Sequence, residues 1–120
     1  MNIPRRSILS TSTLLLPLLV AAVLSACCDS AHLHAREAVL RTNLTILRDV
    51  LDQYRHDKGH APASLQALVD EGYLRQIPVD SFTERRDTWI PVYAPASKGV
   101  VDVHSGARGR GSDGRSYSEW

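Results

Sequence analysis

The clearest pattern in the sequence is a stripe of apolar residues between Ala31 and about Lys58. This stretch contains no proline or glycine, and its apolar residues recur at steps of four, three, four and three. Such spacing places them on one face of an α-helix. The stripe consists of Leu40, Leu44, Leu47, Leu51 and Tyr54.

Further apolar residues widen this stripe beyond the seam of a coiled coil. We therefore expect the helix to pack on its own domain rather than only on another helix. The widening residues are Val39, Ile46 and Val50. Gly59 follows directly, where a left-handed residue ends a helix readily.

Oppositely charged residues stand four apart on the same predicted helix. Glu37 precedes Arg41, and Arg48 precedes Asp52. We expect both pairs on the solvated face, each contributing about 0.2–0.5 kcal/mol and implying no site.

Shorter elements follow the helix. Ser64 is placed to cap a short helix, ended by Gly72, that turns Leu65, Leu68 and Val69 inward. Residues 89–93 and the alternating residues 99–106 predict a strand pair. Together with the long helix, these elements predict an α+β class. The sheet face expected to be buried carries Trp89, Tyr93, Val101 and Val103.

The first 26 residues are typical of an export signal, with Arg5 and Arg6 before an apolar run. From Leu14 to Ala26 this run has 13 residues, whereas a spanning helix needs about 20. Arg5 and Arg6 suit the general or the twin-arginine export route.

The end of the leader reads Leu24-Ser25-Ala26-Cys27, which resembles a bacterial lipobox. Cleavage there would make Cys27 the lipidated first residue, and residues 27–34 a short tether. The alternatives are an uncleaved signal anchor, or an ordinary cleaved signal with two incidental thiols.

Composition excludes some functions. The formal net charge of +1 gives no broad basic surface for nucleic acid. Neither pair of nearby histidines, His32 with His34 or His56 with His60, is completed to a zinc set. No residue group suggests catalysis, so we expect a protein that is not an enzyme.

From Ala35 to Trp120 the order of motifs resembles one known family. After the long helix come Gly59-His60-Ala61-Pro62, a short helix, Gly72-Tyr73-Leu74 with Ile77-Pro78-Val79-Asp80, a strand pair and Asp102-Val103-His104-Ser105-Gly106. Together they are similar to the major pseudopilin of type II secretion, general secretion pathway protein G. The resemblance implies a pseudopilin-like domain over residues 35–120, in which a long N-terminal helix packs on a small antiparallel β-sheet.

The resemblance also implies a structural subunit of the cell envelope whose partners are other pseudopilin or secretion-apparatus subunits. We expect it to be anchored in a membrane by a lipid or an apolar segment, with its domain in the periplasm or otherwise outside the cytoplasmic membrane. This chain departs from the family around residues 7–16, which lack its glycine-phenylalanine junction and its acidic residue. The alternative is a stand-alone envelope lipoprotein that uses the domain as a binding module.

In the resembled family the last long loop binds calcium, and the matching positions here are Ser105 and Asp113. Three arginines, Arg108, Arg110 and Arg115, add positive charge to this loop. The alternative is a glycine-rich loop held by hydrogen bonds without metal. Tyr117 and Trp120 are expected to dock the tail on the sheet.

Overall fold

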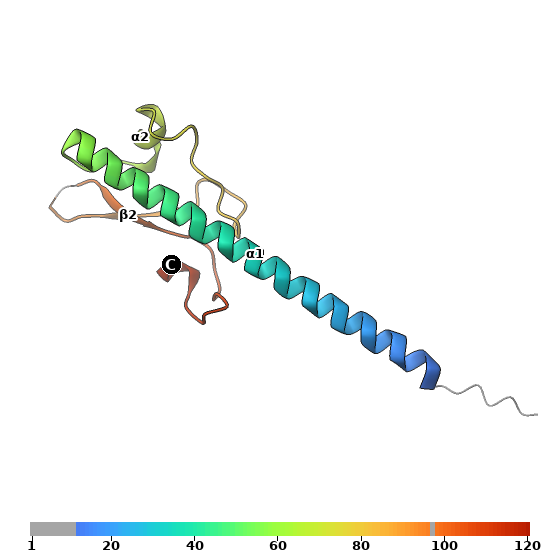
Figure 1. Ribbon diagram of the computed structural model, residues 1–120. Coiled ribbons are helices and arrows are strands. Elements are labelled where there is room, and N and C mark those ends of the chain that lie inside the picture. The colour runs from blue at the N-terminus through green and yellow to red at the C-terminus, as the bar shows by residue number, and fades with distance from the viewer. Residues whose placement is uncertain (1–11, 97) are drawn as a thin grey trace, which may run out of the picture. The chain divides into compact units, whose positions relative to one another are not determined.

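The computed structural model describes residues 12–96 and 98–120. They form helices α1 (Ser12–Lys58) and α2 (Leu65–Asp70), strands β1 (Ile90–Tyr93) and β2 (Val100–His104), and a 3-10 helix η1 (Tyr117–Glu119) (Figure 1). The strands pair antiparallel in a two-stranded sheet. The predicted α+β class is therefore confirmed. Most of the basic start of the leader, including Arg5 and Arg6, lies outside the described residues.

The chain divides into two compact units, Met1–Leu33 and His34–Trp120. In the first unit α1 begins at Ser12, well before the predicted start at Ala31. The reason is composition, because the leader is rich in leucine and alanine, which favour helix. Residues 27–34 are helical, and every side chain described from Leu15 to Leu33 is exposed.

The first part of α1 is also the most apolar part of the chain. By length and composition, α1 could cross a membrane, although a signal sequence near the N-terminus would meet the same criterion. A membrane anchor or an export signal is therefore compatible with the structure of this segment.

In the second unit, the leucine stripe of α1 forms the centre of the core. Leu40, Leu47 and Leu51 are fully buried, and Leu44 and Tyr54 nearly so. They pack with residues from α2, the sheet and the C-terminal segment (Figure 1). These partners are Leu65, Leu68, Trp89, Val100, Val103, Ala107, Tyr117 and Trp120.

The expectation that Val39 and Ile46 widen the buried stripe is wrong. Their side chains are 50% and 42% exposed, while Val50 is partly buried against the core. A two-stranded sheet covers only a narrow strip of a helix, so apolar residues on the flank of the stripe stay in solvent.

The sheet also differs from the prediction at two positions. Tyr93 is 52% exposed and Val101 is only partly buried. Val92 pairs with Asp102 and Tyr93 with Val100, so the ladder passes over Val101 in a bulge. In a regular strand, residues two apart share a face of the sheet. The extra residue of the bulge shifts this alternation by one, so Val100 and Val103, three apart, are both buried.

The connections around α2 follow their local sequence. Gly59 has φ +74° and its N–H bonds the carbonyl of Arg55, which ends α1. Ser64 caps α2 by accepting from the N–H of Ala67. Leu65 and Leu68 are buried, but Val69, also predicted to point inward, is only partly covered.

A matched pair of truncations on α1 tests the burial of the stripe. We expect Leu47→Ala to lower the free energy of unfolding by about 2–5 kcal/mol, because it leaves a cavity in the core. Its neighbour Ile46→Ala removes an exposed side chain and should cost less than about 1 kcal/mol. Urea denaturation of the full chain in detergent measures both, and equal losses would contradict this packing.

Candidate functional site

Glu37 is a fully buried acid on the core face of α1. Its Oε1 accepts from the N–H of Ser112 at 2.7 Å and from the hydroxyl of Tyr117 at 3.1 Å. Its Oε2 accepts from the hydroxyl of Ser112 at 2.5 Å. One carboxylate thus holds the C-terminal loop against the helix.

The two predicted surface pairs have different outcomes. Arg41 lies within ion-pair distance of Glu37, at 4.0 Å, but Glu37 is buried rather than on the solvated face. Arg48 pairs with Asp102 rather than with Asp52. The sequence did indicate that Glu37 would be buried, because it stands three residues before Leu40 and continues the spacing of the stripe. An acid in such a position requires buried donors, which lie 75 to 80 residues away in sequence.

Burial raises the pKa of the Glu37 carboxyl, but the hydrogen bonds from Ser112 and Tyr117, with the charge of Arg41, outweigh it. The net pKa lies below the ordinary value of 4.5. A lowered pKa means that the ionised form stabilises the fold above about pH 4.5. This contribution is lost as the pH falls through the pKa of the folded protein.

A second buried acid, Asp80, organises the segment before β1. It accepts from the N–H groups of Phe82 and Thr83 and, through Oδ2, from the hydroxyl of Ser105 at 2.5 Å. Ser105 in turn accepts from the N–H of Ala107. Asp80 and Ser105 are both fully buried, so this pair joins two loops inside the protein.

The two residues that carry the calcium prediction have separate protein partners. Ser105 is engaged with Asp80, and Asp113 accepts from the backbone and the side chain of Arg115. In the described part of the chain no three His, Cys, Asp or Glu side chains gather as a metal site. Calcium requires six to eight oxygens, so it would need ligands beyond Ser105 and Asp113, and the arginines of this loop oppose a cation. Calcium binding stays a prediction.

The C-terminal segment packs closely on the core, as expected for Tyr117 and Trp120. Tyr117 stacks on Phe82 with ring centroids 4.2 Å apart, and Trp120 meets Tyr117 edge to face. Gly111 allows this approach, because a Cβ there would lie 2.2 Å from the indole of Trp120. The glycine-rich loop is thus fitted to the tail.

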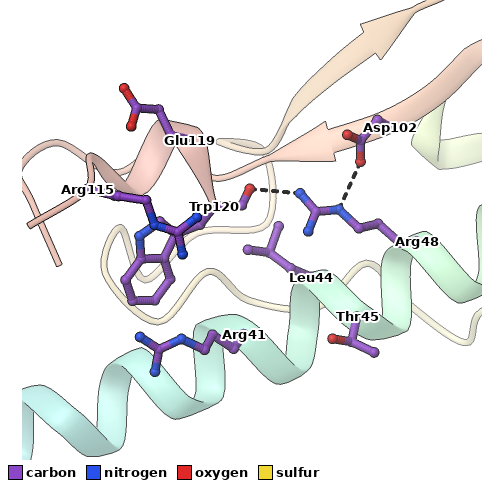
Figure 2. A pocket seen from close by; sticks show the side chains of 8 residues that line it. All are labelled: Arg41, Leu44, Thr45, Arg48, Asp102, Arg115, Glu119 and Trp120. Carbon is purple, nitrogen blue, oxygen red and sulfur yellow. Dashed lines mark hydrogen bonds and ion pairs between the residues drawn. The ribbon is translucent and has the colours of Figure 1, made fainter. Parts of the chain in front are cut away.

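A pocket of about 600 Å³ opens beside this tail. Figure 2 shows its lining: α1 supplies one wall, and Asp102 of β2 and the C-terminal segment supply the rest. Three guanidinium groups and two carboxylates face it. The lining residues are Arg41, Leu44, Thr45, Arg48, Asp102, Arg115, Glu119 and Trp120.

Arg48 links α1 to β2 and to the C-terminal segment at the wall of the pocket. It donates to Asp102 at 2.8 Å, to the carbonyl of Val103 at 3.0 Å and to the main-chain oxygen of Trp120 at 2.7 Å (Figure 2). Burial raises the pKa of Asp102, but the N–H of Val103 and the charge of Arg48 lower it below its ordinary value. Arg48 is therefore a structural group.

The predicted lipidation residue, Cys27, is exposed on α1, as is Cys28. Both stand before the first buried residue described, Glu37. A cut between Ala26 and Cys27 would therefore remove none of the core contacts described above.

Comparison with protein-family models, with curated protein sequences and with solved structures found no match to this chain. The resemblance to pseudopilins therefore rests on the order of motifs in the sequence, and membership of that family stays a prediction.

The role of Glu37 is tested by its isostere. We expect Glu37→Gln to lower the free energy of unfolding at pH 7 by about 1 kcal/mol or more, because an amide cannot accept from every donor that surrounds it. The difference from the wild type should begin to shrink below about pH 4.5, where the carboxyl of the unfolded chain takes up a proton, and should be lost as the pH falls through the lower pKa of the folded protein.

Denaturation of the full chain at pH 7 and at pH 3.5 measures both effects. The exposed Glu84→Gln is the control and should leave stability nearly unchanged. A difference between Glu37→Gln and wild type that persists unchanged in acid would show that the charge of Glu37 is not what stabilises the loop.

Proposed function

We propose that this chain is a non-catalytic, pseudopilin-like component of a type II secretion or type IV pilus-related apparatus, held at a membrane of the cell envelope. The observation that supports this most is α1 itself. It carries exposed apolar residues from Leu15 to Leu24 and, further along, a leucine stripe buried under a small antiparallel sheet. A helix of this kind serves as an anchor at one end and as a domain core at the other.

Processing at Cys27 is the second part of the proposal. The thiol would receive diacylglyceride and become the new first residue after loss of residues 1–26. Each buried methylene contributes about 0.8 kcal/mol, so several acyl chains hold a protein at a membrane without a spanning helix. Loss of the apolar stem would remove the part that forms the filament core in the resembled family. We therefore favour a subunit that accompanies, caps or regulates the apparatus.

Adjacent cysteines make lipidation directly testable. We expect Cys27→Ser to abolish incorporation of radiolabelled palmitate in cells and to leave the precursor uncut, because serine offers no thiol to the acyl transfer. Cys28→Ser is the matched control and should keep the label. Mass spectrometry of the mature N-terminus should find a modified Cys27. Full-length, unprocessed protein in sheared pili would overturn the processing step.

The assembly itself requires a separate experiment. We expect the membrane-extracted protein to co-purify with pseudopilins or other secretion-apparatus subunits after mild cross-linking, and its deletion to leave exported substrates inside the cell envelope. Neither result would be obtained for a protein that works alone. The Cys27→Ser variant separates the two parts, since it removes the lipid without altering the described core.

A stand-alone envelope lipoprotein is the second candidate, favoured by the lipobox at Cys27 and by the missing acidic residue near the start of the apolar segment. Under this proposal the domain is a binding module. Its partners in the same cross-linking experiment would be envelope components other than the secretion apparatus. A genome without neighbouring secretion ATPase and prepilin-peptidase genes would favour it.

A further inference from the structure

The pocket beside Trp120 contains an arginine whose donors are not engaged by the protein. The side chain of Arg41 is about half exposed, and its guanidinium carbon lies 4.1 Å above the ring of Trp120. Its nearest acid is Glu37, at 4.0 Å, beyond hydrogen-bonding distance. Both oxygens of Glu37 already accept from Ser112 or Tyr117. Within the described residues, Arg41 is thus held by stacking rather than by hydrogen bonds.

Stacking on an aromatic ring orients a guanidinium without using its N–H groups. In Figure 2 the guanidinium of Arg41 lies beside the indole of Trp120, at the side of the pocket formed by α1. The fork of an oriented arginine matches the two oxygens of a carboxylate. Thr45, one turn further along α1, is exposed and lines the same pocket with a hydroxyl group.

The other arginines of the pocket differ from Arg41. Arg48 donates three hydrogen bonds, to Asp102, Val103 and Trp120, and the Nε of Arg115 donates to Asp113 at 2.9 Å. The indole N–H of Trp120 is buried and has no acceptor in the part of the chain that the structure describes, so it is not presented to the pocket. Arg41 is therefore the lining arginine that has no hydrogen-bonded acid among the described residues.

We propose that this pocket binds a carboxylate side chain from an acidic segment of a partner protein, with Arg41 as the residue that recognises it. The geometry of Arg41 favours this ligand, because a stacked guanidinium presents its N–H fork to the two oxygens of a carboxylate. Arg48 and Arg115 each have a hydrogen-bonded acid, Asp102 and Asp113, whereas Arg41 has none. A monoanion is repelled less by Asp102 and Glu119 of the lining than a dianionic phosphate is. The inference is independent of the secretion apparatus, since it depends only on the folded unit His34–Trp120.

The two tryptophans provide a built-in test. The indole N–H of Trp89 donates to the carbonyl of Pro78 at 2.8 Å inside the core, whereas Trp120 lines the pocket. The full chain, ¹⁵N-labelled in detergent micelles, is titrated with a hexaglutamate peptide and with a hexaglutamine peptide. We expect the indole NMR signal of Trp120 to shift saturably with hexaglutamate only, and that of Trp89 to stay in place.

Variants then assign the effect to Arg41. Arg41→Gln should weaken hexaglutamate binding by about tenfold or more, because a charge-assisted bidentate contact is lost. Arg41→Lys keeps the charge and should still lose several-fold, since lysine has no fork. Arg75→Gln removes the same charge from an exposed position outside the pocket and should bind like the wild type.

Three results would overturn the proposal. The first is a Trp120 signal that hexaglutamate does not move. The second is an equal loss in Arg41→Gln and Arg75→Gln, which would indicate nonspecific charge attraction. The third is a saturable shift with inorganic phosphate at least as tight as with hexaglutamate, which would assign the pocket to a phosphate-type anion. Should Arg41→Gln not fold, Arg41→Lys and the wild-type titrations still decide between these results.

Discussion

Burial of the leucine stripe on α1 is the interaction on which the rest of the folded unit depends. A two-stranded sheet is only marginally stable by itself, because one of its faces has nothing to cover it. Here Val100 and Val103 of β2 gain that cover from Leu40, Leu47 and Leu51. Each fully buried leucine contributes about 1.5–3 kcal/mol, so a few side chains supply most of the driving force for this small core. Because the sheet is narrow, the flanks of α1 remain free for other contacts.

Two buried acids hold the loops on the core, as the buried leucines hold the helix on the sheet. Long segments around residues 71–89 and 105–116 have little regular structure, so backbone ladders cannot hold them. Asp80 and Glu37 accept several hydrogen bonds each from these segments and fix them to the core. A buried carboxylate is costly unless it is fully satisfied, which makes such contacts specific to one loop arrangement. The Gly111 contact with Trp120 adds a steric requirement to the same loop.

These features separate the roles of the two units of the chain. The first unit offers exposed apolar residues and a candidate lipidation thiol, which suit a membrane. The second has a stable core with an arginine pocket at the surface, which suits a polar partner. Under the proposals made above, the first unit holds the protein at a membrane and the second binds a partner, a combination that suits a component of a larger envelope assembly. It fits equally a lipoprotein with a single binding surface, and the two proposals differ in the partner rather than in the physics of the site.

The sequence by itself determined what depends on local spacing. It predicted the helical stripe, the stop at Gly59, the cap at Ser64, the α+β class and the docking of Tyr117 and Trp120, because helix periodicity, capping and aromatic burial are short-range or compositional signals. Only the tertiary structure decided what depends on residues far apart in the chain. The bulge at Val101 determines which sheet residues are buried. Glu37 accepts hydrogen bonds from Ser112 and Tyr117, and Arg48 pairs with Asp102 rather than with Asp52. These pairings depend on which groups the fold brings within about 3 Å of each other. The spacing of residues along one helix does not contain that information.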